Sequence, residues 1–458
     1  MKIHFIFLFL CFLPFLFSQT QTEAGGIKIA LNQKLLTSAL NNFFNDINAY
    51  VKEFPIPDVR LFKGCNARNI KGKIFNFDRN KVKIELKTEG IRVLITDLQG
   101  EITTRIDSSF AIIPFHNNAV ITVHKLSLDA TVRLSSAYKN GRKILKAEFV
   151  GVPGYRVSYD ISMDGFLNKI LSAIAEYFAD RQIAKIMNDK IDGYLQDAID
   201  SLPLEVQVDS TNNYWLDYSL INDIRFKNEF LELNVYGLLY KKGNTDTAQK
   251  SRYPLSQLPV INKMEKELQL YVSEYSLNSA LYTIIQTNNF RDKLKINDVK
   301  TKFLEPLLQG IQKKYGNVNT DVYFSTEVPK LTITEESVNA KMGGTITVKP
   351  ITVNKPAYYI HFQTYFKLDL CVLPGPYISA KIIDMSAKTD TVYINDIGAS
   401  TTVLEDVFSS VKEVFSLVLD DLLKNKIRLR FKQILGLKFS DLSLTHKNQY
   451  LVVKYNLS

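Results

Sequence analysis

Cysteine is scarce in this chain of 458 residues. Of its three cysteines, Cys11 lies in an apolar N-terminal run, which leaves only Cys65 and Cys371. A framework of several disulfides, which stabilises many small secreted domains, is therefore excluded. The two remaining cysteines could form one bridge or stay separate thiols, because the sequence does not show whether their Cα atoms lie within about 7 Å.

Catalytic motifs are also missing. The chain has no Gly-x-Ser-x-Gly, no His-Glu-x-x-His and no Cys-x-x-Cys, and no glycine-rich phosphate loop precedes a predicted helix. Its scattered Asp and Glu residues single out no acid–base pair. We therefore predict that the protein is not an enzyme and carries no metal or cofactor. Nucleic-acid binding is disfavoured because no recognition motif is present.

The N-terminus is predicted to be a secretory signal peptide. Lys2 is positively charged, residues 3–17 are almost entirely apolar, and the chain becomes polar at Ser18. A membrane anchor is the alternative, but the run is shorter than the roughly 20 residues that span a bilayer. We expect residues 1–19 to be removed and the mature protein to be secreted, outside the cell or in the lumen of the secretory pathway.

What the sequence does contain is a long-range repeat. Residues 27–31 (Ile-Lys-Ile-Ala-Leu) align with residues 268–272 (Leu-Gln-Leu-Tyr-Val), 241 positions later. Without a gap, residues 36–40 then align with residues 277–281. Each copy has the pattern of a short strand followed by an amphipathic helix. A repeat over this distance indicates a duplicated domain rather than a solenoid.

Each copy is predicted to contain one short and one long helix. Apolar residues between positions 36 and 50 recur at spacings of four and three, which gives one apolar stripe. Residues 165–201 carry a longer stripe, in which Ile174 aligns with Val411 of the second copy. Such stripes usually form closed core, but they could also line an apolar tunnel.

Alternating segments predict antiparallel strands with one apolar face. They include residues 81–87, 125–134 and 366–370, and a final strand at residues 450–455. The Asn140-Gly141 pair predicts a tight hairpin turn.

Positive charge is unevenly distributed along the chain, whose net charge is +10. Between positions 60 and 87 only Asp78 and Glu85 oppose a group of basic residues. These are Arg60, Lys63, Arg68, Lys71, Lys73, Arg79, Lys81, Lys83 and Lys87. They predict a surface for an anionic partner, such as lipid head groups or an anionic membrane. Alternatively, some of these residues form the solvent-facing side of an amphipathic strand, where their charge protects a sheet edge against aggregation.

Several segments resemble one family in their order and spacing. The strand Gly-Ile-Lys-Ile at residues 26–29, the short helix and the Phe-Pro-Ile-Pro-Asp of residues 54–58 are similar to the start of the lipid-binding serum glycoproteins. That family includes bactericidal/permeability-increasing protein, lipopolysaccharide-binding protein and the plasma lipid transfer proteins. Residues 253–259 and 270–280 resemble the entry into its second domain, and residues 448–453 resemble its last strand.

The resemblance implies an α+β boomerang of two similar rolls in tandem. In each roll a twisted antiparallel sheet wraps around a long helix and a shorter helix, and a central sheet joins the rolls. We place the signal peptide at 1–19, the first roll at 20–205, a connector with central-sheet strands at 206–260, and the second roll at 261–458. One departure is that residues 110–201 lack the cysteine of the family's usual disulfide.

The resemblance also implies one apolar pocket for phospholipid acyl chains in each roll. The residues expected to line the pockets are Leu36, Leu40, Phe43, Phe44, Phe166, Ile170, Ile174 and Phe178 in the first roll, and Leu281, Ile284, Ile285, Val407, Val411 and Phe415 in the second. Bound phospholipid would be the ligand, with no other cofactor.

Three functions remain open from the sequence. The first is a secreted, monomeric lipid-binding protein that could transfer lipid or dock on anionic membranes through its basic residues. The second is an antimicrobial or pattern-recognition protein of innate immunity that binds lipopolysaccharide. The third is a scaffold whose rolls are filled by their own side chains.

Overall fold

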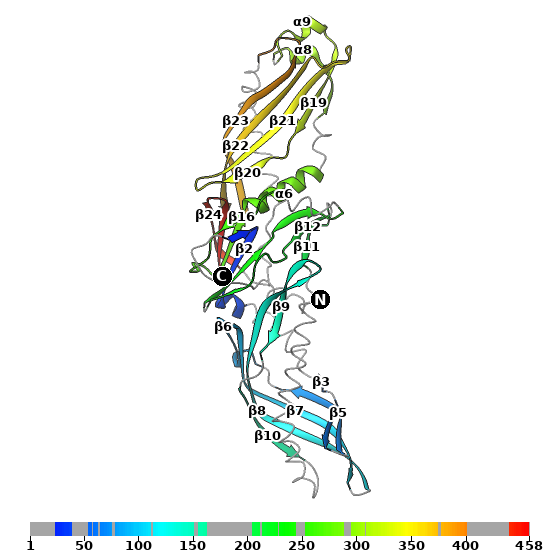
Figure 1. The fold of residues 1–458 in the computed structure, drawn as a ribbon, viewed down its shortest axis with the longest axis vertical. Coiled ribbons are helices and arrows are strands. Elements are labelled where there is room, and N and C mark those ends of the chain that lie inside the picture. Colours follow the sequence, from blue (N-terminus) through cyan, green and yellow to red (C-terminus); the bar gives the residue numbers. More distant parts are fainter. Residues whose placement is uncertain are drawn as a thin grey trace.

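The structure is a computed structural model. The described residues are 23–38, 54–56, 58–62, 65–75, 78–110, 113–150, 154–162, 204–210, 213–227, 229–243, 252–287, 295–306, 308–373, 377–400 and 439–457. They form an elongated, gently curved molecule with a sheet at each end and another between them (Figure 1). The expected signal peptide and both expected long helices lie outside the described residues.

The central sheet has six strands in the order β13-β14-β2-β17-β25-β24. Their bounds are Arg225–Phe226, Phe230–Val235, Ile27–Asn32, Leu268–Ser273, Tyr450–Leu457 and Phe439–Lys447, respectively. All neighbouring strands are antiparallel. The strands predicted at the start of each copy and at the end of the chain are confirmed.

The two copies of the repeat meet in the middle of this sheet. Ile29 of β2 lies opposite Leu270 of β17, which is its equivalent 241 positions later. A hairpin completes the sheet on each side, β13–β14 beside β2 and β24–β25 beside β17. The copies are therefore related by an approximate two-fold axis through this residue pair, which explains the repeat in the sequence.

The first end sheet has the order β10-β8-β7-β5-β3, with β4 on β5, β6 on β7 and β9 on β8. From β3 to β10 the bounds are Phe54–Ile56, Val59–Phe62, Cys65–Ile74, Val82–Lys87, Gly90–Phe110, Ile113–Lys139, Arg142–Phe149 and Gly154–Ser162. The expected hairpin turn joins β8 to β9, with Asn140 and Gly141 at φ values of 51° and 73°. Both values fit a tight hairpin turn.

The second end sheet has the order β18-β19-β21-β22-β23, with β20 on β21. From β18 to β23 the bounds are Lys295–Lys300, Asn319–Thr326, Lys330–Ile333, Val338–Pro350, Tyr358–Leu373 and Tyr377–Asn395. The described helices of this second half are α6 (Glu274–Thr287), α8 (Thr301–Leu304) and α9 (Ile311–Tyr315). None of the helices in the described ranges is long and apolar enough to cross a membrane.

Smaller pairings connect these layers. β1 (Glu23–Gly25) pairs with β16 (Ser256–Leu258). β11 (Glu205–Asp209), β12 (Tyr214–Asp217) and β15 (Leu238–Lys241) form a three-stranded sheet. The fold class expected from the sequence, two antiparallel sheets joined by a central sheet, is confirmed for the described residues.

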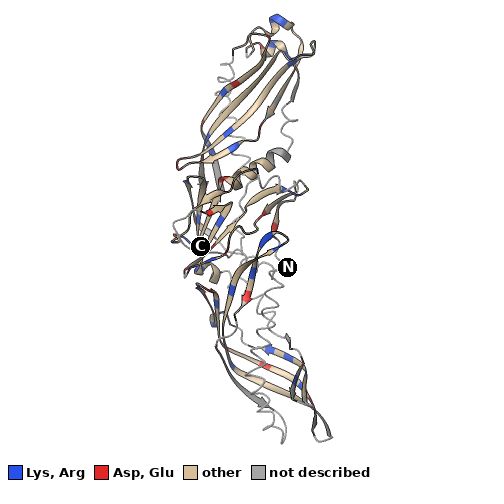
Figure 2. Cartoon of the chain, in the orientation of Figure 1, with Lys and Arg blue, Asp and Glu red and all other residues tan. Residues whose placement is uncertain are grey.

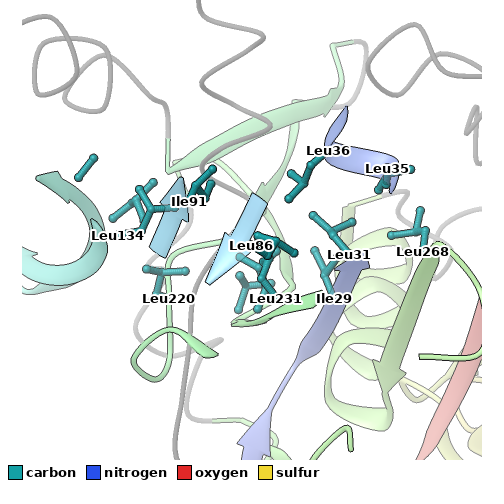
Figure 3. Close-up of a cluster of buried hydrophobic side chains, with 14 of the residues drawn as sticks. Ile29, Leu31, Leu35, Leu36, Leu86, Ile91, Leu134, Leu220, Leu231 and Leu268 are labelled. Atoms are coloured by element: carbon teal, nitrogen blue, oxygen red, sulfur yellow. The ribbon is translucent and has the colours of Figure 1, made fainter. Parts of the chain in front are cut away.

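The main apolar core lies where the first end sheet meets the central sheet. Ile29 and Leu31 of β2 pack with Leu86 of β6 and Leu231 of β14, and all are buried (Figure 3). Gly26 directly precedes β2, and a Cβ atom there would collide with the backbone oxygen of Tyr236, so this close approach requires glycine.

Cys65 and Cys371 lie far apart. Cys65 begins β5 and Cys371 is near the end of β22, in end sheets on opposite sides of the central sheet (Figure 1). This separation excludes a bridge between them.

Candidate functional site

An apolar surface lies on the inner face of the second end sheet, beside α6. Its members come from the helix and from three neighbouring strands. They are Leu277 and Leu281 of α6, Leu331 and Ile333 of β20, Val338 and Ala340 of β21, and Phe366, Leu368 and Leu370 of β22. The register aligns them, since Ala340 lies opposite Phe366 and Val338 opposite Leu368. We call this set the α6 surface.

Polar side chains of α6 fix the helix to the edge of β20. The Asn278 side chain donates to the Leu331 oxygen at 3.0 Å and accepts from the Leu331 nitrogen at 2.7 Å. The Glu274 carboxylate accepts from the Ile333 nitrogen at 2.5 Å. Burial raises the pKa of the Glu274 carboxyl, although this hydrogen bond opposes the shift. These bonds satisfy backbone groups that would otherwise remain open at a strand edge.

The opposite side of α6 is held by β15. Ser279 accepts a hydrogen bond from the Leu239 nitrogen at 3.2 Å, and the Thr283 hydroxyl donates to the Leu239 oxygen at 2.8 Å. Because the helix is fixed between two strand edges, Leu277 and Leu281, which are four residues apart, both face the sheet.

Coverage of this inner face changes along the sheet. At the far end, Ile311 and Ile360 are 0 % exposed and Tyr358 is 1 % exposed, so the core there is closed. Beside α6, the members from β20 and β21 are also buried, whereas Leu281 and Phe366 are only partly buried. The α6 surface therefore has apolar side chains that face inward and keep accessible area.

The structure describes only part of the predicted lipid-binding set. Leu281 belongs to the α6 surface, and Ile284 and Ile285 lie in the same helix. Leu36 is 3 % exposed and belongs to the main core instead. The remaining members lie outside the described residues: Leu40, Phe43, Phe44, Phe166, Ile170, Ile174, Phe178, Val407, Val411 and Phe415.

Leu36 is held in the core by a capped helical turn. Residues 33–38 are helical, and the Asn32 side chain accepts a hydrogen bond from the Leu35 nitrogen at 2.9 Å. Leu35 and Leu36 then pack with buried residues such as Leu86 and Ile91 (Figure 3). The structure therefore joins Leu36 to closed core rather than to the α6 surface.

The predicted basic residues fall on two parts of the first end sheet. Arg68, Lys71 and Lys73 lie on β5, which pairs with residues 100–108 of β7. Lys83 and Lys87 lie on β6, which pairs with residues 90–95 of β7. The two groups therefore lie beside different segments of the same long strand, β7. Arg60 is on β4 beside β5, Arg79 and Lys81 form the short turn before β6, and Lys63 lies outside the described residues.

The two groups also differ in their surroundings. Lys83 and Lys87 both pair with Glu85, at 2.6 and 3.0 Å, and hold the pKa of that carboxyl at about 2. On β5, exposed Lys71 and Lys73 are two positions apart and share one face of the strand. The Lys73 Nζ atom is 5.6 Å from the ring centroid of Phe75, which is 51 % exposed.

A polar groove lies at the ends of the inner strands of the central sheet, β14, β2, β17 and β25. It is lined by Asn32, Gln33, Lys34, Glu229, Met264, Glu265, Lys266, Glu267 and Asn456. Two of its three carboxylates are ion-paired, Glu265 with Lys454 and Glu267 with Lys34, each at 2.6 Å. The polar lining makes this groove unsuitable for acyl chains.

Two kinds of site residue were missed in the sequence. The strand residues Phe366, Leu368 and Leu370 were predicted as an apolar face but not as site residues, although their alternation was the available signal. The anchoring residues Glu274 and Asn278 gave no signal, because polar helix residues usually face solvent.

Comparison with known proteins identifies the family. A model of the C-terminal domain of the LBP / BPI / CETP family matches residues 208–457, which is more than half of the chain. The chain belongs to this family. Its members bind or transfer lipids and are not enzymes, which confirms the expectation that this chain is not an enzyme.

Individual relatives are distant. The human "BPI fold-containing family C protein" is 24 % identical over 314 residues, which cover 63 % of this chain but only 58 % of the human protein. The crystal structure of lipopolysaccharide binding protein gives a TM-score of 0.45 at 13 % identity, with 95 % of this chain and 99 % of that chain covered. P47 from Clostridium botulinum A2 gives 0.28 at 13 % identity, with 94 % and 97 % covered. Structural similarities this remote support no functional argument.

Proposed function

We propose that the protein is a secreted, monomeric lipid-binding protein that holds acyl chains against the apolar inner faces of its two end sheets. The observation that carries the proposal is the α6 surface, whose Leu281 and Phe366 face inward but remain partly accessible. Membership of a family of lipid-binding and lipid-transfer proteins supports the same function.

The energetics favour an acyl chain as the occupant. Each buried CH₂ group contributes about 0.8 kcal/mol, so ten of them contribute about 8 kcal/mol before the cost of ordering the lipid. The proposed second pocket adds Ile284, Ile285, Val407, Val411 and Phe415 to the α6 surface. The proposed first pocket is lined by Leu40, Phe43, Phe44, Phe166, Ile170, Ile174 and Phe178, with Leu36 at its closed end.

A substitution that fills the second pocket tests the proposal. Leu281→Trp places a large ring on the α6 surface, so we expect phospholipid uptake from vesicles to fall by about half if the two pockets contribute equally. Ile383→Trp is the matched control, because Ile383 is 46 % exposed on β23 and is not part of the α6 surface. Unchanged uptake by Leu281→Trp, with thermal unfolding like that of the wild type, would reject this pocket.

The basic residues of the first end sheet are proposed to contact lipid head groups or an anionic membrane. Charge reversal at Lys71, Lys73 and Lys81 is expected to weaken binding to anionic vesicles at low salt, by about 1 kcal/mol for each lysine near the surface. The loss should shrink as salt rises, because exposed charges are screened over about 8 Å at physiological ionic strength. Equal vesicle binding by the variant and the wild type would remove the head-group role and leave the pocket proposal intact.

A second candidate function is recognition of lipopolysaccharide or another bacterial envelope lipid. The exposed Lys71 and Lys73 beside the exposed ring of Phe75 favour it, because they present cations next to an apolar group. Lipopolysaccharide binding or bacterial killing that is lost on charge reversal at these two lysines would support this candidate. Activity that does not need them would oppose it.

A further inference from the structure

Two large apolar side chains project from the far end of the second end sheet. Phe303 of α8 is 65 % exposed and Ile351 is 58 % exposed. Lys300, at the end of β18, pairs with Asn319, whose oxygen accepts a hydrogen bond from the Ile351 nitrogen at 3.0 Å. Because Phe303 follows Lys300 by three residues, both apolar side chains lie at the same end. We call this end the α8 tip.

The α8 tip is well bonded internally. The Thr301 hydroxyl donates to the Gly316 oxygen at 2.5 Å, and the Thr301 nitrogen donates to the Val318 oxygen at 3.0 Å. The Glu305 carboxylate accepts from the nitrogens of Gly310 and Gln312, both at 2.7 Å. The tip therefore has a defined conformation.

Other apolar side chains of the tip are buried. Ile311 is 0 % exposed and Leu308 is 7 % exposed, and both belong to the closed far-end core. The tip thus has a core of its own, and Phe303 and Ile351 stay outside it. Exposed apolar side chains that lie at one place and are rimmed by polar residues mark a candidate contact surface.

Positive charge surrounds these two side chains. Lys300, Lys302, Lys313 and Lys355 are exposed, and within the described part of the chain none of them is ion-paired. The Lys302 Nζ atom lies 4.9 Å from the Phe303 ring centroid. Figure 2 shows the basic residues gathered around α8 and α9 at this end of the molecule.

The acidic groups of the tip are already engaged. Glu305 caps the start of α9, and the Asp298 side chain accepts from the Asn319 amide at 3.0 Å. Asp396 lies 3.9 Å from the Lys314 Nζ atom. None of these carboxylates forms an ion pair with Lys300, Lys302, Lys313 or Lys355 in the described part of the chain, so these four lysines can contact an outside anion.

We propose that the α8 tip docks on an anionic lipid surface, with Phe303 and Ile351 entering the head-group region and the lysines contacting anionic head groups. Apolar side chains flanked by lysines are the composition of segments that bind at membrane interfaces. The inference goes beyond the proposed function, because it uses neither the inner faces of the sheets nor β5, which lies at the other end of the molecule (Figure 1).

Charge reversal tests the electrostatic part. The variant Lys302→Glu/Lys313→Glu/Lys355→Glu is compared with the wild type for binding to phosphatidylcholine vesicles with and without about one third phosphatidylserine. Each lysine is expected to contribute about fivefold to the partition coefficient, which corresponds to about 1 kcal/mol, so we expect a loss of at least tenfold on anionic vesicles at low salt. The control Lys263→Glu/Lys381→Glu/Lys388→Glu makes the same charge change at exposed residues outside the tip and should retain most of the binding.

Insertion is tested with a fluorescent reporter. Trp215 is the only tryptophan, so Trp215→Phe/Phe303→Trp gives a single reporter at the tip. We expect a blue shift of its emission and quenching by brominated lipid in anionic vesicles. The control Trp215→Phe/Ile383→Trp reports from the outside of β23 and should show neither. Phe303→Ser/Ile351→Ser should weaken vesicle binding by about tenfold, whereas Ile383→Ser should not.

The outcomes separate this inference from the proposed function. Lost vesicle binding with unchanged bound lipid in the tip variants would support the docking surface. Wild-type-like vesicle binding by those variants, no quenching of the tip reporter, or equal binding to neutral vesicles would overturn it, and would point to a protein partner. Loss of bound lipid together with vesicle binding would also overturn it, because the effect would not be confined to the tip.

Discussion

The two copies of the repeat have the same local design but different surroundings. Asn32 and Ser273 are equivalent, and each caps the helix that follows it, by accepting from the nitrogens of Leu35 and Ser276. One turn later the copies diverge. Leu36 is 3 % exposed in closed core, whereas its equivalent Leu277 is only partly buried. The two copies thus share the strand–helix junction, but at this position the apolar face of the second copy is more exposed.

The opposite face of the central sheet shows a second difference. Lys28 is fully buried, with its Nζ atom 3.0 Å from Glu232, 3.4 Å from Glu23 and 2.6 Å from the Pro259 oxygen. Burial lowers the pKa of Lys28, and the charge of Glu232 opposes the shift. Its equivalent Gln269 is neutral and accepts a hydrogen bond from the Tyr271 hydroxyl. The first copy therefore has a buried charge network at this position, where the second copy has a neutral side chain.

The largest predicted effect is a loss in the free energy of unfolding, which should be greater for a substitution at Lys28 than for one at Gln269. Lys28→Met leaves Glu232 buried without its nearest cation, so we expect it to lower the free energy of unfolding by about 3–5 kcal/mol. Gln269→Leu leaves only the Tyr271 hydroxyl unpaired and should cost about 1–3 kcal/mol. Urea denaturation of both variants measures the difference. Equal losses would show that the charge network is not specific to the first copy.

An intermediate effect is expected at the equivalent leucines. Leu36→Ala opens a cavity in closed core and should cost about 2–5 kcal/mol. Leu277→Ala removes a partly accessible side chain, so its cost should lie at or below the lower end of that range, while phospholipid binding should fall. Unfolding free energy and bound lipid are measured for both. A reversed order, with Leu277→Ala the more destabilising and lipid binding unchanged, would contradict an open second site.

The smallest effect concerns the first residue of each helix. Gln33 accepts from the Leu86 nitrogen at 3.2 Å, and its equivalent Glu274 accepts from the Ile333 nitrogen at 2.5 Å. Burial raises the pKa of Glu274 in the folded state above its unfolded value of about 4.5. The protein is therefore most stable, with respect to this group, below about pH 4.5, where Glu274 is protonated. This contribution to the free energy of unfolding is lost as the pH rises through the raised pKa. Glu274→Gln should therefore be slightly more stable than the wild type at pH 7, with the advantage fading toward pH 4. A constant difference across this range would contradict the pKa shift.

Local patterns predicted the strands and turns well. The turn at Asn140-Gly141, the alternation in β8 and β22 and the strand at the start of each copy follow from neighbouring residues, and all are confirmed. The antiparallel meeting of the copies at Ile29 and Leu270 did not follow, because the repeat shows equivalence but not which strands pair.

Long-range pairing explains what the sequence could not show. Asn278 looks like a solvent-facing helix residue, but its partner Leu331 lies 53 positions later. Lys28 looks like the polar position of an alternating strand, but β1 and the segment around Pro259 cover it. The basic residues are close in sequence, yet β5 and β6 pair with different parts of β7. In each case a distant segment decides the environment.

The most direct test of lipid binding is mass spectrometry of an organic-solvent extract of the purified, secreted protein. We predict about two phospholipids per chain in the wild type, and fewer in Leu281→Trp than in Ile383→Trp. An extract without lipid, even after incubation of the protein with vesicles, would mean that the apolar faces pack on themselves. That result would contradict lipid binding and leave the protein as a scaffold.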